Sequence, residues 1–173
     1  MKHLLLATIC LAVLVDGAAA QHQHQQSPYV DLKTREIKAL SDEAVQDYRN
    51  GSGMSLALSA ELNMYPGPRH VLDLADVIGL DAELLARVVA IRDAMHTDAV
   101  RIGTQIVNRE RALDRAFAHR TIDSTRLRSM TNEIGRLQGE LRFVHLTAHL
   151  AVAEVLSETQ IEQYEMHRGY SGH

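Results

Sequence analysis

The sequence predicts an all-α fold, an elongated antiparallel helical hairpin with short helices packed on it, and three observations lead to this prediction. One long stretch repeats apolar residues at spacings of four and seven, which is an 11-residue helical repeat. A second stretch alternates spacings of three and four, as a heptad helix does. No proline follows Pro68. The apolar residues are Leu80, Leu84, Ile91, Met95, Ile102, Ile106, Leu113 and Phe117 in the first stretch, and Leu127, Met130, Ile134, Leu137, Leu141, Val144, Ala148, Ala151 and Val155 in the second.

The two stretches are joined by about five residues, 119–123, so we expect an αα-hairpin. A pair of helices has one narrow apolar seam and cannot bury a globular core alone. Phe143, Leu146 and Leu150 lie off the heptad stripe. We therefore expect a homodimer that buries residues 143–150.

The N-terminal segment 1–20 is typical of a cleavable signal peptide. A weakly basic start precedes about twelve apolar residues and the small-residue run Ala18-Ala19-Ala20. The apolar run is too short for a permanent membrane anchor, and no later stretch is long and apolar enough to span a bilayer. Cys10 is the one cysteine and lies inside this segment, so a mature chain would lack disulfides and thiol chemistry. We expect an exported, periplasmic product without an integral membrane segment.

Residues 21–40 begin as a Gln/His-rich tail without periodicity, and we expect a disordered tail and linker there. A helical domain over 41–170 should follow. Ser41 can cap a short helix ending at Arg49, and 54–64 forms a second, stopped by the Pro-Gly-Pro turn at 66–68. A third should cover 69–79.

The long helices have predicted caps at both starts. Asp81 can cap the first, which should reach about His119, and Asp123 or Ser124 the second, which should reach about Val155. A last helix should cover 158–168 and end at Gly169. Its start, Leu156-Ser157-Glu158-Thr159-Gln160, is a capping box in which Ser157 and Gln160 satisfy each other's backbone amides.

These features together resemble the Spy/CpxP superfamily of LTxxQ-motif periplasmic proteins, which includes stress chaperones and heavy-metal resistance and sensor proteins. The resemblance rests on export, absence of mature cysteine, the hairpin and the box at Leu156, Ser157 and Gln160, and it covers roughly residues 41–170. The segment 53–80 looks like that of the heavy-metal-resistance branch. The chain departs from the pattern at Ser157, where threonine is usual. It also departs at 80–84, where the expected earlier box keeps an acidic cap but lacks glutamine.

The resemblance implies an envelope-stress or heavy-metal-resistance protein that binds unfolded or misfolded periplasmic proteins without ATP and has some capacity for metal. The alternative is a periplasmic heavy-metal sensor that regulates a signalling partner. No cofactor is required by either function; zinc, copper or nickel are the metals to consider. No enzyme signature is present in the sequence, so we expect no catalytic residues.

His145 and His149 are the strongest metal-ligand candidates. Their i,i+4 spacing lets both imidazoles project from one helix face, which suits zinc, copper or nickel. The alternative is a pair of hydrogen-bonded structural histidines. Two histidines are an incomplete ligand set, and further ligands would come from a second chain or from these candidates: His70, His96, Met95 and Met64.

The tail offers His22 and His24 as a weaker, exposed pair of metal ligands. If cleavage follows Ala19, His22 becomes the third residue and can join the free amine in square-planar ligation of copper(II) or nickel(II). Cleavage after Ala20 removes that arrangement. The alternative to metal binding is a tail that serves solubility alone.

The distal half of the hairpin is basic, with nine arginines against five acidic residues between Arg101 and Arg142. Arginine stems and guanidinium groups can contact both apolar and acidic segments of an unfolded chain. The alternative is a solvated face with i,i+4 ion pairs. Export and the lack of interleaved aromatic residues argue against nucleic acid. The client-binding candidates are Arg109, Arg115, Arg126 and Arg136.

Overall fold

A computed structural model describes residues 27–170 of the chain, and these residues form six α-helices and one 3-10 helix without any strand. The all-α prediction is therefore confirmed. Residues from Asp31 onward belong to one structural unit, and the preceding residues belong to another. The predicted signal peptide, His22 and His24 lie outside the described residues. Within residues 27–170, no helix has the length and apolar character needed to cross a membrane.

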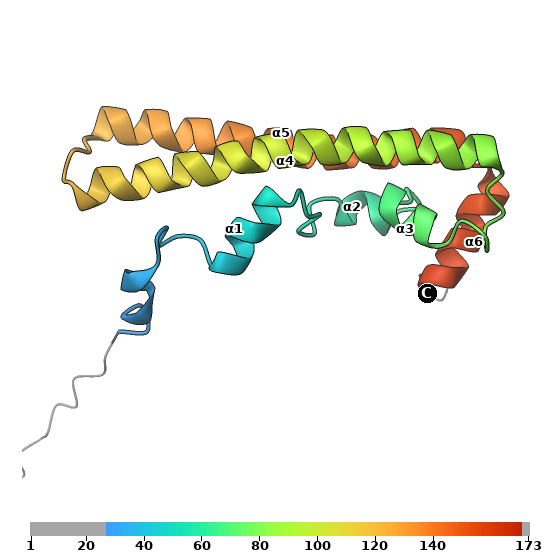
Figure 1. The fold of residues 1–173 in the computed structure, drawn as a ribbon, viewed down its shortest axis with the longest axis horizontal. Coiled ribbons are helices and arrows are strands. Elements are labelled where there is room, and N and C mark those ends of the chain that lie inside the picture. The colour runs from blue at the N-terminus through green and yellow to red at the C-terminus, as the bar shows by residue number, and fades with distance from the viewer. Residues whose placement is uncertain (1–26, 171–173) are drawn as a thin grey trace, which may run out of the picture. The chain divides into compact units, whose positions relative to one another are not determined.

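The two long helices form the predicted hairpin, α4 (Ala82–Ala118) and α5 (Ser124–Val155), which lie side by side in Figure 1. Asp81 accepts a hydrogen bond from the amide of Leu84 at 2.8 Å, as expected of the N-cap. Asp123, rather than Ser124, caps α5 and accepts from the amide of Arg126 at 2.8 Å. The turn between the helices uses a left-handed residue, Arg120, with φ 55°.

The middle of the hairpin is held by apolar residues of both predicted stripes. Burial along the apolar stripe of α4 is uneven. Phe117, in the last turn of this helix, is 53% exposed. The seam therefore closes toward the middle and remains open at the tip. The buried cluster at the seam consists of Ala99, Ile102, Ile106, Leu137 and Leu141.

Helix α1 (Asp42–Arg49) packs against α4, and Gly103 makes this approach possible. A Cβ on Gly103 would overlap the carbonyl oxygen of Tyr48, a backbone atom that cannot move aside alone. Gly139 on α5 has open space around its Cβ direction, so the close helix approach is the one between Gly103 and α1.

The next two helices, α2 (Leu58–Glu61) and α3 (Pro68–Asp73), are shorter than the predicted 54–64 and 69–79. The prediction failed because left-handed residues interrupt helical geometry: Met54, Ser55 and Met64 have φ of 44°, 60° and 65°. Apolar composition alone could not reveal these conformations. The outcome is a set of turns that runs along the hairpin and covers part of it (Figure 1).

The end of the hairpin opposite the α4–α5 turn is closed by α6 (Glu158–Arg168), whose predicted capping box at Ser157 and Gln160 is present. Gln160 also donates to the carbonyl of Gly79 at 3.3 Å, which ties the box to the segment before α4. Leu156 is 8% exposed. The motif residues therefore have structural roles at this end. The core cluster here consists of Val71, Ile78, Val88, Val152, Leu156 and Tyr164.

Residues 31–40, which we expected to be a disordered linker, contain the 3-10 helix η1 (Asp31–Thr34) and a segment attached to the hairpin. Ile37 is 2% exposed. On either side of it, Glu36 accepts from Arg111 at 2.6 Å and Lys38 pairs with Asp114 at 3.0 Å. The sequence of this segment has no apolar periodicity, and its contacts depend on residues about 75 positions later. The contacts could therefore not be predicted from the segment itself.

Candidate functional site

The candidate site is a cavity of about 630 Å³ into which His145 and His149 of α5 both face. The two side chains are 3% and 8% exposed, as their position in an apolar stretch predicted. Helical spacing of four residues places them one turn apart on the same side of α5.

Three of the four additional ligand candidates reach the same cavity. His70 comes from α3, and Met95 and His96 come from α4. The fourth, Met64, is 52% exposed and is not part of the lining. The fold thus brings to one cavity several residues that the sequence could identify only as separate candidates.

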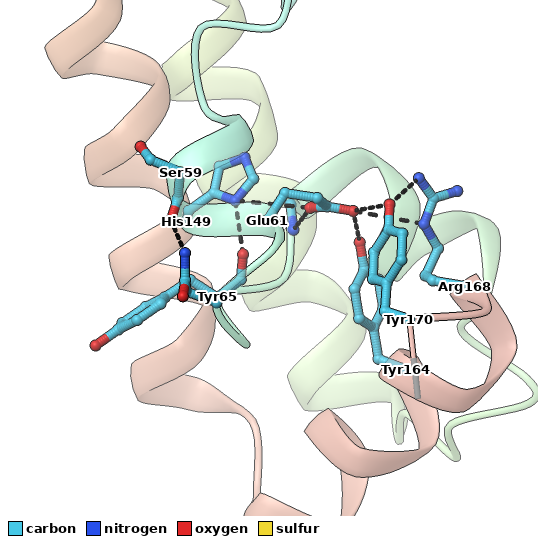
Figure 2. A network of polar contacts seen from close by, with 9 residues as sticks. Ser59, Glu61, Tyr65, His149, Tyr164, Arg168 and Tyr170 are labelled. Atoms are coloured by element: carbon cyan, nitrogen blue, oxygen red, sulfur yellow. Dashed lines mark hydrogen bonds and ion pairs between the residues drawn. The ribbon is translucent and has the colours of Figure 1, made fainter. Parts of the chain in front are cut away.

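A backbone hydrogen bond fixes the orientation of the His149 ring (Figure 2). Its Nδ1 lies 2.7 Å from the carbonyl oxygen of Tyr65. A carbonyl only accepts, so Nδ1 carries the hydrogen, and in the neutral ring the lone pair is then on Nε2. Histidines that ligate metals are commonly oriented in this way, with the other ring N–H donated to a carbonyl or carboxylate.

Gly67 keeps the Nε2 edge of His149 accessible. A Cβ at position 67 would lie 2.9 Å from Cε1 and 3.1 Å from Nε2 of the ring. Any side chain there would press on the edge that carries the lone pair. The amide of Gly67 is also used, since it donates to Glu61 Oε2 at 3.1 Å.

The second histidine has an unused nitrogen. Nε2 of His145 is buried and has no hydrogen-bond partner among the described residues. Burial lowers the pKa of His145, and the neighbouring His149 lowers it further. The His145 ring is therefore neutral at neutral pH, which is the form that binds metals.

A buried carboxylate, Glu61, lies beside His149 and links α2 to α6 (Figure 2). Its Oε1 accepts from the hydroxyls of Tyr164 at 2.5 Å and Tyr170 at 3.2 Å, and Nε of Arg168 lies 3.4 Å away. The distance from Glu61 Oε2 to Nδ1 of His149 is 3.8 Å. These contacts satisfy a charge that burial would otherwise make costly.

The same network keeps Tyr164 protonated. Burial raises the pKa of Tyr164, and its hydrogen bond to Glu61 and the charge of that carboxylate raise it further. Neither Glu61 nor its partners were predicted from the sequence. The available signal was an acidic residue inside an apolar segment, 54–64. Nothing in the sequence paired it with tyrosines about one hundred residues later.

Within the part of the chain that the structure describes, the site contains two buried histidines and no further protein ligand in place. Among residues 27–170, no group of three or more His, Cys, Asp or Glu side chains is arranged to hold a metal ion. A metal on His145 and His149 would therefore need water or a cavity residue that moves, such as His70, His96 or Met95. Open positions of this kind are compatible with zinc, copper and nickel.

The four predicted client-binding arginines do not share one environment. Arg109 pairs with Glu133 at 2.9 Å and Arg136 pairs with Glu140 at 2.7 Å. Arg126 donates to the carbonyl of Thr121 at 2.9 Å. Arg115 lines a separate cavity at the hairpin tip. The first two are therefore already engaged within the chain.

An apolar surface lies on the other side of α5 from the histidines. Phe143 is 67% exposed and Leu150 is 51% exposed. A groove of about 300 Å³ is lined by Phe143 and includes Ala94 and Met95 of α4. Two residues along a helix correspond to about 200° of rotation, so Phe143 and His145 face nearly opposite directions. Leu146 is already partly buried within the chain, whereas Phe143 and Leu150 are exposed. Phe143 and Leu150 are therefore the better candidates for the predicted dimer face.

Comparison with known proteins found no matching family model, no matching curated protein and no matching solved structure.

Proposed function

We propose that this protein is a non-enzymatic metal-binding protein of the bacterial periplasm that takes zinc, copper or nickel on His145 and His149. One observation carries the proposal: both imidazole rings line one cavity, and they lie one helical turn apart on α5. The Nε2 of His145 has no partner among the described residues. In His149, Nδ1 is the nitrogen that contacts the Tyr65 carbonyl, so Nε2 on the other side of the ring is not used by this bond.

The donor set favours borderline transition metals over calcium and magnesium. Neutral imidazoles suit zinc, copper and nickel, whereas the hard cations take oxygen ligands. Met95 adds a thioether to the lining, which would favour copper over zinc if it approaches the metal. A role in resistance to heavy metals follows from such binding, in agreement with the family that the sequence resembles.

The test is calorimetric titration of the chain from residue 21 with zinc, copper(II) and nickel. The double change of His145 and His149 to Ala should weaken binding at least about tenfold, as loss of direct ligands does. A matched control changes two exposed histidines outside this cavity, His119 and His167, to Ala. Equal affinity in the two double variants would leave His145 and His149 as structural residues.

Deletion of residues 21–26 separates the tail from the cavity. We expect a smaller loss from this deletion than from the double change at His145 and His149, since His22 and His24 are the weaker of the two predicted ligand pairs. If the deletion removes all binding, the tail histidines His22 and His24 are the site instead.

We infer a second candidate function, binding of unfolded proteins or of a second copy, from the exposed Phe143 and Leu150 beside an apolar groove. Contiguous exposed apolar surface is typical of interaction sites. Changing both residues to Asp should abolish ATP-independent suppression of aggregation and dissociate a homodimer, with helicity retained. Changing Arg109, Arg115, Arg126 and Arg136 together to Glu tests the electrostatic part. Retained suppression in both variants would remove this function.

The sensor alternative has its own support in the Glu61 network. Glu61 lies next to His149 and also accepts a hydrogen bond from Tyr164 of α6. Glu61 therefore connects the cavity physically to α6, and a metal in the cavity can influence the position of that helix. Protection of α6 amides from hydrogen exchange should change on metal addition if the protein signals through this helix. Unchanged protection would favour resistance by binding alone.

A further inference from the structure

A second cavity, of about 410 Å³, lies at the tip of the hairpin and is lined by basic and hydrogen-bond-donating side chains. Three arginines line it, and no lining residue is acidic. This volume is in the range of small-molecule sites. The polar lining consists of Asn108, Arg111, Arg115, His119, Thr121 and Arg126.

Helical spacing and the turn bring these side chains together. Arg111, Arg115 and His119 are each four residues apart and share one side of the end of α4. The left-handed residue Arg120 then reverses the chain. The capped start of α5 places Arg126 at the same cavity. The concave basic surface is therefore a direct product of how this turn is built.

Two of the guanidinium groups are held in place by neutral acceptors of the chain. Arg111 Nη1 donates to Asn108 at 3.0 Å, and its side chain is only 17% exposed. Arg126 donates to the carbonyl and hydroxyl oxygens of Thr121 at 2.9 and 3.3 Å. Such bonds fix both groups, which lowers the ordering cost of binding an anion. Arg126 forms no ion pair within residues 27–170, whereas Arg111 also pairs with Glu36 at 2.6 Å.

The neighbouring acidic residues leave a positive excess. Glu36 pairs with Arg111, Asp114 with Lys38, and Asp123 is used as the cap of α5. Arg115 has no ion pair within residues 27–170. The hydrogen bond and charge of Arg111 lower the pKa of Glu36, and the charge of Arg115 also lowers it. Glu36 therefore remains negatively charged and offsets the charge of Arg111, its ion-pair partner.

We propose that the tip cavity binds an anion that carries two linked phosphate groups, with Arg111, Arg115 and Arg126 as the charged contacts. Guanidinium forks match phosphate oxygens in pairs, and the side-chain amide of Asn108 adds a neutral donor. The cavity is larger than a single phosphate needs, which favours a diphosphate. The phosphates can belong to a soluble molecule or to lipid headgroups, and the experiment distinguishes these sources.

The test titrates the full chain with inorganic pyrophosphate at about 150 mM salt, where exposed charges are screened beyond about 8 Å. Arg115→Gln should weaken binding about threefold or more, and Arg115→Gln with Arg126→Gln about tenfold or more, because charge-assisted bonds are lost. The control, Arg87→Gln with Arg128→Gln, removes the same charge from exposed positions outside the cavity and should change affinity less than about twofold. Circular dichroism checks that helicity is retained, and Arg115→Gln alone removes no intramolecular ion pair.

Vesicles with and without phosphatidylglycerol identify the source of the phosphate. If the chain binds anionic vesicles through Arg115 and Arg126 and pyrophosphate releases it, the site takes lipid headgroups. If pyrophosphate binds and vesicles do not, the ligand is soluble. Absence of pyrophosphate binding, or an equal loss in the cavity and control variants, would overturn the proposal.

Discussion

The two ends of the α4–α5 hairpin carry their polar residues in opposite ways. Near α6, the side chains of Glu61, His145 and His149 are all less than 10% exposed, and both oxygens of Glu61 and Nδ1 of His149 have hydrogen-bond partners within the chain. Toward the tip, the paired side chains of Arg109 and Glu133 are 53% and 38% exposed. One pair of helices therefore supports a buried polar site at one end and a solvated charged surface at the other.

This difference predicts how each end responds to substitution. Removing one partner of a buried polar group leaves the other without compensation, which costs several kcal/mol. An exposed ion pair contributes about 0–1 kcal/mol and weakens with salt. Substitutions near α6 should therefore change folding stability, and substitutions near the tip should chiefly change binding.

The largest effect is expected from Glu61→Ala. It removes the acceptor of Tyr164 and the charge partner of Arg168, and should lower the free energy of unfolding by about 2–4 kcal/mol. Glu133→Ala removes an exposed carboxylate and should cost less than about 1 kcal/mol. Urea denaturation measures both. Similar losses in the two variants would contradict the contrast between the ends.

A smaller loss should follow Tyr164→Phe, which removes a single buried hydroxyl. We expect about 1–2 kcal/mol in urea denaturation, since a hydrogen bond to a charged group is lost while the ring remains packed. Tyr170→Phe is the matched control, because its hydroxyl lies farther from Glu61, at 3.2 Å, on a half-buried side chain. A greater loss of stability in Tyr170→Phe would mean that Tyr170, and not Tyr164, makes the main hydrogen bond to Glu61, which would contradict this prediction.

The hairpin was predictable because its determinants are local. Apolar periodicity, the acidic caps at Asp81 and Asp123 and the box at Ser157 each act within one or two turns, and the structure contains them all. The i,i+4 spacing of His145 and His149 likewise predicted their shared face, and the apolar surroundings predicted burial.

The rest depends on long-range pairing. Ile37 and the ion pairs beside it need partners on α4, and Glu61 needs Tyr164 on α6. No short-range pattern contains this information. The left-handed residues Met54 and Met64, which shorten α2, are similarly invisible in composition because their side chains usually favour helices.

Stability should also depend on pH through His145. Its pKa in the folded state lies below the unfolded value, so the unfolded chain binds the proton first as pH falls. The stability that this group contributes is complete above about pH 6.5 and declines as pH falls toward the folded pKa. Urea denaturation with a chelator at several pH values measures the decline. His145→Gln should show a weaker decline, and identical slopes would exclude this role of burial.

The smallest effect is expected on the exposed face of α5, midway along the hairpin. Arg136→Ala breaks an ion pair with Glu140 on the exposed face of α5 and should change the free energy of unfolding by less than about 0.5 kcal/mol. Thermal unfolding at low and high salt should give nearly the same small difference. A loss above about 2 kcal/mol would mean that this face of α5 is buried, as in a tight assembly.

The most direct test of the central claim is X-ray absorption of the zinc-loaded chain without residues 21–26. If His145 and His149 hold the metal, the spectrum should contain imidazole nitrogens at about 2.0–2.1 Å, and these should disappear when both histidines are changed to Ala. The control with His119 and His167 changed to Ala should retain them. An unchanged spectrum in the His145/His149 variant, or a parent spectrum without imidazole ligands, would contradict the metal site.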